Sequence, residues 1–321
     1  MGKLLALATA LLVAAAPHPG VAQDAYPSRA IRLVVSYPPG GSSDLIGRVL
    51  AQGLQDELRR EVVVENRGGG GGVVGVEMVA RAAPDGYLLL VTNAATFGTV
   101  PQVLPRLPYD PRSDFTPISI VAQTFSPLGV GIELPVRNVQ ELVALARREP
   151  GRLNFGTAGT GSLGHFLGEM LRVQAGIDIV HVPYRGSGLA MNDMIAGRVQ
   201  IMIDPTVAAE ASNGRVRLIG VANAMRMPGW PDVPTMQESG FPELMSSGAV
   251  GLVGPAGMPR DIVDRLNAAA AAMAAAPASA DRLGRLGVMP RHSTPAELAT
   301  AISADLDRFA RVKRDAGLVF E

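Results

Sequence analysis

The sequence has 321 residues, with 29 basic and 29 acidic side chains, no cysteine and only 4% aromatic residues. A neutral chain without a basic stripe and interleaved aromatics is not expected to bind nucleic acid. The lack of cysteine excludes disulfides, thiolate metal sites and thiol nucleophiles. A chain of about 300 residues usually divides into two domains, each with its own core.

The N-terminus is typical of a secretory signal peptide. Lys3 makes the N-terminal end positively charged, residues 4–16 are a largely apolar run, and Val21 and Ala22 suit a cleavage site. The apolar run is shorter than the roughly 20 residues that a membrane-spanning helix needs. We therefore expect residues 1–22 to be removed after export, and the fold is predicted without them.

Short apolar segments alternate with helical patterns along the rest of the chain. The predicted strands lie at residues 31–35, 62–65, 87–92, 153–155, 179–182, 199–203 and 218–221. The predicted helices lie at residues 44–58, 74–82, 139–148, 162–174, 187–196, 260–275 and 296–315. Strands that alternate with helices in this way form parallel sheets with helices on both faces. The sequence therefore predicts a doubly wound α/β fold.

Two segments are predicted to connect two lobes. Residues 121–131 are apolar and extended, and residues 246–259 are rich in glycine, serine and proline. A chain that crosses twice between compact halves has a discontinuous first lobe and a continuous second lobe. We expect residues 23–122 and 253–321 to form the first lobe and residues 123–252 to form the second.

Two glycine-rich loops each lie between a predicted strand and a predicted helix, at residues 37–44 and 156–162. Ligands of open α/β sheets bind beyond the carboxyl ends of strands. There, glycine lets the backbone approach closely, and the N–H groups of the following helix attract anions. One such loop in each half predicts an anion held between the lobes. The candidate ligand-binding residues of the loops are Tyr37, Gly40, Gly41, Ser42, Thr157, Gly159, Thr160, Gly161 and Ser162.

The second loop permits two other interpretations. Residues 159–164 match the G-x-G-x-x-G spacing of dinucleotide-binding loops. No acidic residue follows at the expected distance of roughly 20 residues, so we expect no cofactor. A secreted hydrolase could use Ser162 and His165, although Thr160 replaces the glycine of a nucleophile elbow. Capping of the following helix is a simpler role for Ser162.

The remaining polar candidates do not indicate a metal site. The four histidines have no metal-ligand spacing, so no metal is expected. Asp204 follows the predicted strand at residues 199–203. Its carboxylate could contact a ligand amine or water, or it could cap the next segment.

Several motifs occur in an order that is specific to one family. Residues 37–44 read Tyr-Pro-Pro-Gly-Gly-Ser-Ser-Asp, residues 82–87 read Ala-Ala-Pro-Asp-Gly-Tyr, and residues 180–186 read Val-His-Val-Pro-Tyr-Arg-Gly. With Leu-Pro-Tyr-Asp-Pro at residues 107–111, they resemble the substrate-binding proteins of tripartite tricarboxylate transporters, the Bug family. The resemblance extends over essentially the whole chain after the signal peptide.

The resemblance implies a type II periplasmic binding protein, with two α/β lobes joined by two crossover segments. It implies a small carboxylate ligand, such as a di- or tricarboxylate, an amino acid or an aromatic acid. By the same resemblance, Asn93 and Ala94 in the loop at residues 92–96 and Asp204 join the two glycine-rich loops at the ligand. His165, close to the start of the helix after the second loop, is a further candidate because it could reach the cleft. A monomer without catalytic activity, located in the periplasm and delivering ligand to membrane permease subunits, is the expected role. A sensor that reports ligand to a signalling receptor stays an alternative.

Two segments depart from the family pattern. Residues 248–250 read Gly-Ala-Val where the family usually has a bulky aromatic pair, and the loop at residues 93–97 is also atypical. Both departures are expected to reshape the distal end of the pocket. The sequence therefore leaves open which carboxylate binds and how many carboxylate groups it carries.

Overall fold

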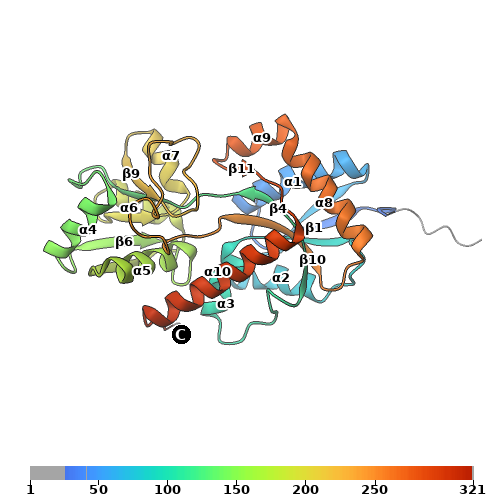
Figure 1. Ribbon diagram of the computed structural model, residues 1–321, viewed down its shortest axis with the longest axis horizontal. Coiled ribbons are helices and arrows are strands. Elements are labelled where there is room, and N and C mark those ends of the chain that lie inside the picture. The colour runs from blue at the N-terminus through green and yellow to red at the C-terminus, as the bar shows by residue number, and fades with distance from the viewer. Residues whose placement is uncertain (1–25, 41, 320–321) are drawn as a thin grey trace, which may run out of the picture.

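The computed structural model describes residues 26–40 and 42–319, without the side chain of Ser42. The expected signal peptide, residues 1–22, and the candidate site residue Gly41 lie outside the described residues. The described chain forms two lobes, each built on one β-sheet (Figure 1). Among the described residues, no helix combines the length and apolarity that crossing a membrane requires.

The first lobe contains a six-stranded sheet in the order β11-β4-β10-β3-β1-β2. Its strands are β1 (Ile31–Val35), β2 (Val62–Asn66), β3 (Leu88–Thr92), β4 (Phe115–Gln123), β10 (Ala249–Pro255) and β11 (Met289–Pro290). Strand β1 is parallel to β2 and β3, whereas β10 is antiparallel to β3 and β4. A parallel sheet with added antiparallel strands results.

Helices cover both faces of this sheet because successive side chains of a strand point to opposite faces. In β1, Leu33 and Val35 belong to the core cluster on one face, and Val34 belongs to the cluster on the other. The first face is covered by α1 (Ser42–Leu58), α8 (Arg260–Ala275) and α9 (Pro277–Gly284). The second face is covered by α2 (Val73–Ala80) and α10 (Pro295–Asp315). Three short elements complete the lobe: η1 (Gly70–Gly72), η2 (Ala95–Thr99) and α3 (Val100–Val103).

The second lobe contains a five-stranded sheet in the order β7-β6-β8-β5-β9. Its strands are β5 (Pro127–Gly131), β6 (Leu153–Thr157), β7 (Ile179–Pro183), β8 (Ile201–Ile203) and β9 (Val216–Val221). Helices α4 (Val139–Arg148) and α5 (Leu163–Ala175) pack on one face, and α6 (Ser187–Ile195) and α7 (Thr206–Ser212) pack on the other. The predicted doubly wound α/β fold is confirmed in both lobes.

The antiparallel strands were not predicted, and their place in the chain explains them. Residues 124–126 lead from β4 in the first lobe to β5 in the second, and residues 222–248 lead back from β9 to β10. Strands β1, β3 and β6 end at the boundary between the lobes, whereas β5 and β10 begin there. A strand that starts at this boundary is therefore antiparallel to the strands that end at it.

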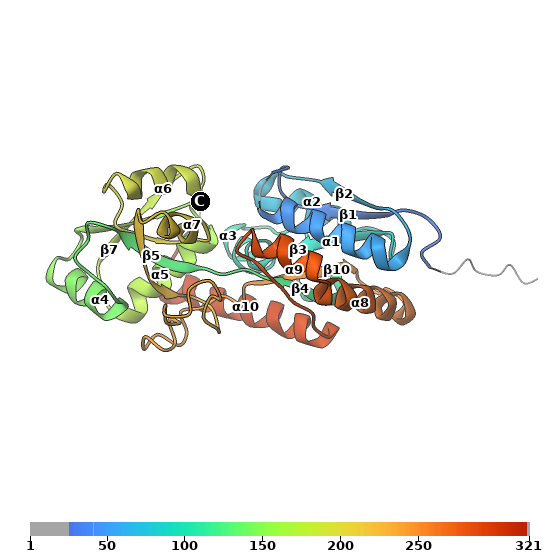
Figure 2. The same cartoon turned by 90° about the horizontal axis from the view of Figure 1, so that it is seen from above.

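Helix α10 extends along both lobes (Figures 1 and 2). Its first half packs on the six-stranded sheet through Leu298 and Ile302. Its second half places Phe309 in the core of the second lobe, with its ring centroid 5.6 Å from that of Phe166. This helix is therefore a third connection between the lobes, in addition to the two crossovers. The exact lobe boundaries stay a prediction.

Candidate ligand-binding site

Two adjoining cavities lie between the lobes. The crossover cavity, of about 530 Å³, is lined by Tyr37, Pro38, Pro39, Ser43, Ile46, Asn93, Ala94, Ala95, Thr124, Leu163, Pro205 and Val250. The glycine-lined cavity, of about 470 Å³, is lined by Tyr37, Gly70, Gly71, Ala95, Thr99, Val100, Val103, Leu104, Ala158, Gly159, Thr160, Gly161, Ser162 and Leu163. Tyr37, Ala95 and Leu163 line both cavities, so the two cavities form one cleft.

The N-termini of two long helices meet at this cleft, one from each lobe. Ser43 in the first turn of α1 lines the crossover cavity, and Leu163, the first residue of α5, lines both cavities. The first N–H groups of a helix have no carbonyl partner within the helix. These groups carry a partial positive charge that attracts anions. The cleft therefore offers uncharged donors and positive dipole ends from both lobes.

The first glycine-rich loop is held in place by the buried carboxylate of Asp44. Its oxygens accept hydrogen bonds from the Gly40 N–H (2.9 Å), from Arg48 Nε (3.0 Å) and from Asn66 Nδ2 (3.0 Å). Asn66 Nδ2 also donates to the carbonyl of Tyr37 at 3.1 Å. Burial raises the pKa of Asp44, but these hydrogen bonds outweigh burial and hold the pKa below its usual value. Asp44 and Asn66 therefore order the loop, and the Gly40 N–H donates its hydrogen bond to Asp44 at the end of the same loop.

Asn93 holds the turn that follows β3. Its Oδ1 accepts hydrogen bonds from the N–H groups of Ala95 (3.0 Å) and Thr96 (3.1 Å), and its Nδ2 donates to Ser43 Oγ at 3.3 Å. The next residues form a single π-helical turn, a feature frequent at functional sites. Burial raises the pKa of Tyr37 to about 12, against the opposing effect of a hydrogen bond with Asn93. The Tyr37 phenol is therefore a neutral group at the cleft.

The second glycine-rich loop ends in a side-chain cap on α5. Ser162 Oγ accepts a hydrogen bond from the His165 N–H at 3.3 Å, and the Gly161 N–H donates to His165 Nδ1 at 3.1 Å. The Gly159 N–H donates to Thr157 Oγ1 at 3.2 Å. The loop thus uses the N–H groups of Gly159 and Gly161 to hold its own shape. Thr160, Ser162 and Leu163, the first residue of α5, line the glycine-lined cavity.

His165 forms a stacked pair with His181 beneath this loop. The ring centroids are 3.9 Å apart with an angle of 10° between the rings, and His181 Nε2 lies 2.7 Å from Thr157 Oγ1. Burial lowers the pKa of each histidine to about 4, and in His165 the neighbouring His181 contributes to this shift. Both imidazoles are therefore neutral at neutral pH.

The contacts of His165 favour capping over catalysis for Ser162. His165 Nδ1 accepts from the Gly161 N–H, and its Nε2 lies 4.0 Å from Glu169 Oε1. Both ring nitrogens are thus directed to groups other than the Ser162 hydroxyl. A serine nucleophile needs an imidazole within hydrogen-bond reach of its hydroxyl. The geometry does not support the hydrolase alternative.

Most of the candidate site residues come together at the cleft. Those that line it are Tyr37, Asn93, Ala94, Gly159, Thr160, Gly161 and Ser162. Thr157 and His165 are buried outside the lining, and Gly40 is exposed and also outside it; all three hold the loops in the ways described above. The side chain of Ser42 is, like Gly41, outside the described residues.

Asp204 lies next to the cleft, where Pro205 is part of the lining. Its Oδ2 accepts from Ser187 Oγ at 2.6 Å, and its Oδ1 accepts from the N–H and Oγ1 of Thr206 at 2.9 and 2.7 Å. Oδ1 is therefore engaged at the start of α7 and Oδ2 at the start of α6, so the carboxylate joins the first residues of these two helices.

Several lining residues were not among the sequence candidates. Ser43 was part of the first loop and Thr124 part of the first crossover, so position in the chain was a usable signal for both. Val100, Val103 and Leu104 had no such signal, because α3 is a four-residue helix without a recognisable motif. A Cβ atom on Gly161 would lie 2.5 Å from Val103 Cγ2. The two lobes thus touch where the second loop meets α3.

Comparison with known proteins identifies the family. A family model described as the tripartite tricarboxylate transporter family receptor matches residues 46–318. The chain belongs to this family. Protein BugT of Bordetella pertussis is 33% identical to this receptor over 320 residues, which cover 99% of this chain and 98% of BugT. A protein encoded in the tcbD–tcbE intergenic region of Pseudomonas sp. strain P51 is 37% identical over 293 residues, covering 90% of this chain and 87% of that protein.

Solved structures support the same assignment. The R. palustris protein Rpa4515, solved with adipate, is 30% identical with a TM-score of 0.79, covering 92% of this receptor and 100% of that chain. MatC of Rhodopseudomonas palustris, solved with bound malate, is 30% identical with a TM-score of 0.74, covering 89% of this receptor and 99% of MatC. The periplasmic binding protein BugD is 31% identical with a TM-score of 0.74, covering 92% of this receptor and 100% of BugD. The expected type II periplasmic binding protein fold is confirmed.

Proposed function

We propose that this receptor captures a small organic carboxylate in the periplasm and delivers it to the membrane permease subunits of a tripartite tricarboxylate-type transporter. The observation that carries the proposal is the meeting of the α1 and α5 N-termini, one from each lobe, at a single cleft. Family membership supports it, as do the carboxylates in two related structures. No catalytic step is part of this role.

The anion is bound by uncharged groups in this proposal. Hydroxyls of Ser43, Thr160 and Ser162 and the first N–H groups of α1 and α5 surround the carboxylate. A hydrogen bond to a charged acceptor contributes about 1.5–3 kcal/mol, so several of them suffice for tight binding. Because the donors belong to both lobes, the bound anion stabilises the arrangement in which the lobes are close together.

A thermal-shift panel of mono-, di- and tricarboxylates, sugars and inorganic cations tests the proposal. A ligand at about a hundred times its dissociation constant stabilises a protein by about 2.7 kcal/mol. For a chain of this size, at least one carboxylate should therefore raise the melting temperature by about 5 °C. A panel in which sugars or cations raise the melting temperature and no carboxylate does would contradict the proposal.

A further inference from the structure

The lining of the cleft has no charged side chain among the described residues. Its polar groups are neutral: a phenol, an amide and the hydroxyls of serine and threonine. Asp204, which adjoins the lining residue Pro205, uses both carboxylate oxygens on Ser187 and Thr206. Asp44, which adjoins the lining residue Ser43, uses its oxygens on Gly40, Arg48 and Asn66. A ligand amine would therefore find no carboxylate partner in the lining, and a second ligand carboxylate would find no cation.

An apolar wall lies beside the proposed anion site. Val100, Val103 and Leu104 line the glycine-lined cavity together with Leu163, and all four side chains are half-buried. Leu163 is also the first residue of α5, the helix whose N-terminus faces the anion. If the carboxylate of a ligand binds at this N-terminus, the rest of the ligand lies next to these four aliphatic side chains.

The crossover cavity extends the apolar lining on the other side of Leu163. Ile46 and Val250 contribute aliphatic side chains there. Gly248 and Ala249 precede Val250, so the second crossover places small residues beside this cavity. The cleft therefore has room for an extended apolar group on either side of the anion site.

We propose that the ligand carries a single carboxylate on an apolar body, either aliphatic or aromatic, and that Val100, Val103, Leu104 and Leu163 select for that body. This inference rests on the function proposed above and narrows its ligand class. An apolar group gains free energy when it leaves water for such a wall. A second carboxylate against the same wall would lose its hydration without gaining a partner, which is unfavourable.

Isothermal titration calorimetry with matched ligand pairs tests the inference. Hexanoate is compared with adipate, and 4-methylbenzoate with terephthalate, because each pair differs only in whether the far end is a methyl group or a carboxylate. The monocarboxylate should bind about tenfold tighter or more in at least one pair and should not be the weaker ligand in the other. Dicarboxylates that bind as tightly as their partners, or tighter, would overturn this inference and leave the proposed function standing. If none of these four ligands binds, and no compound of the wider carboxylate panel binds either, the result would instead contradict the proposed function itself.

Substitutions in the wall test whether it contacts the ligand. Leu104→Arg places a cation in the wall and should reduce the preference for the monocarboxylate by about tenfold or more, since a second carboxylate then has a partner. The control Val63→Arg adds the same charge at an exposed position of β2, 43% exposed and outside both cavities, and should leave the preference unchanged. Leu104→Ser, a milder change, should weaken the binding of the monocarboxylate alone. Unchanged preferences in Leu104→Arg and unchanged affinity in Leu104→Ser would overturn the role of the wall.

Discussion

Residues behind the cleft lining determine its shape as much as the lining does. The stacked imidazoles of His165 and His181 show this, because Nδ1 of His165 accepts the Gly161 N–H and His181 contacts the Thr157 hydroxyl. These contacts fix both ends of the second glycine-rich loop. Protonation of His165 would turn Nδ1 from an acceptor into a donor and break the bond to Gly161.

The histidine pair predicts that stability falls in mild acid. Both pKa values are lowered to about 4 in the folded protein, against about 6.5 for an unfolded chain. Between these values the unfolded state binds more protons, so the stabilisation is complete above about pH 6.5 and is lost as the pH falls toward 4. Urea unfolding at about pH 7 and about pH 5 should show each histidine contributing a loss on the order of 1–2 kcal/mol.

Two variants isolate this effect. His181→Gln should lose less stability between the two pH values than the wild type does, because one titrating group is gone. His292→Gln removes a histidine in a loop of the other lobe, where Nε2 lies 3.0 Å from Asn267 Oδ1, and is the control for the same substitution away from the pair. Equal pH dependence in the wild type and His181→Gln would show that the pair does not control acid stability.

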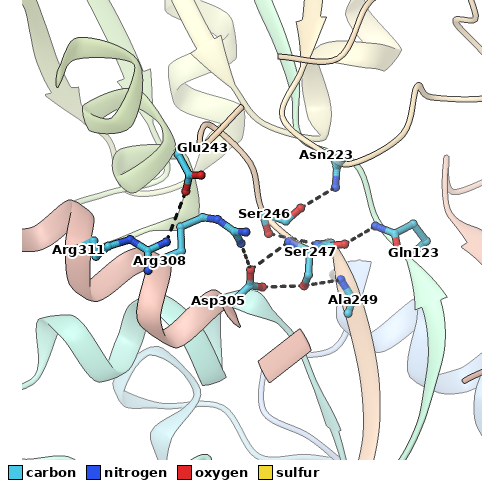
Figure 3. Close-up of polar contacts among 10 residues, drawn as sticks. Gln123, Asn223, Glu243, Ser246, Ser247, Ala249, Asp305, Arg308 and Arg311 are labelled. Atoms are coloured by element: carbon cyan, nitrogen blue, oxygen red, sulfur yellow. Dashed lines mark hydrogen bonds and ion pairs between the residues drawn. The ribbon is translucent and has the colours of Figure 1, made fainter. Parts of the chain in front are cut away.

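At the scale of elements, α10 is tied to the second crossover by a buried carboxylate (Figure 3). Asp305 is 3% exposed and accepts hydrogen bonds from the N–H of Ser247 at 3.1 Å and from its Oγ at 2.6 Å. Arg308 Nη1 donates to the same carboxylate at 2.8 Å. On the other side, Gln123 Nε2 donates to the carbonyl of Ser247 at 2.7 Å, which adds the end of β4 to the network. Helix α10 and both crossovers therefore meet at Ser247.

Loss of this carboxylate should destabilise the protein strongly. Asp305→Ala leaves the N–H and hydroxyl of Ser247 without their acceptor, and we expect a cost of about 2–4 kcal/mol in the free energy of unfolding. Asp307→Ala is the matched control on the same helix, because Asp307 is 58% exposed and pairs with Arg112 at 2.6 Å. An exposed ion pair contributes less than about 1 kcal/mol. Similar losses for the two variants in urea unfolding would contradict the role of Asp305.

At the scale of the whole molecule, Gly248 lies where the two crossovers touch. Its φ is +62°, and a Cβ atom there would fall on the Gln123 side chain and the Thr124 carbonyl oxygen and lie 2.6 Å from Asn223 Nδ2. All three neighbours belong to the crossovers or to the strand that leads into one. The close approach of the two connections therefore depends on the absence of a side chain at this position.

Gly248→Ala should therefore destabilise the joined lobes by more than backbone strain alone. We expect a cost of about 3 kcal/mol, from about 1 kcal/mol for the positive φ and about 2 kcal/mol for the overlap. Gly257→Ala is the matched control, because Gly257 has a φ of +84° and a Cβ atom there would have no other atom within 4 Å. Chemical unfolding of both variants gives the comparison, and equal costs would show that the crossovers can move apart freely.

The sequence by itself determined the local structure of this receptor. The side chains of Leu33, Val34 and Val35 point alternately to opposite faces, which places β1 between two layers of helices. Ser162 caps the start of α5 by accepting a hydrogen bond from the N–H of His165, three residues later. The two glycine-rich loops were also found from the sequence, since each follows a strand and precedes a helix. Such features depend on residues within one or two turns of each other, so periodicity and capping rules are sufficient to predict them.

Only the tertiary structure decided how these parts meet. The contact of Gly161 with Val103, the stacking of His165 on His181 and the apolar wall beside the proposed anion site join segments that are distant in the chain. Ser247 and Asp305 are likewise 58 residues apart. No local rule links such residues, because their distances follow from the packing of two lobes and of α10 across them. The position of the proposed anion site follows from local structure, whereas the character of the groups around it follows from the way the lobes come together.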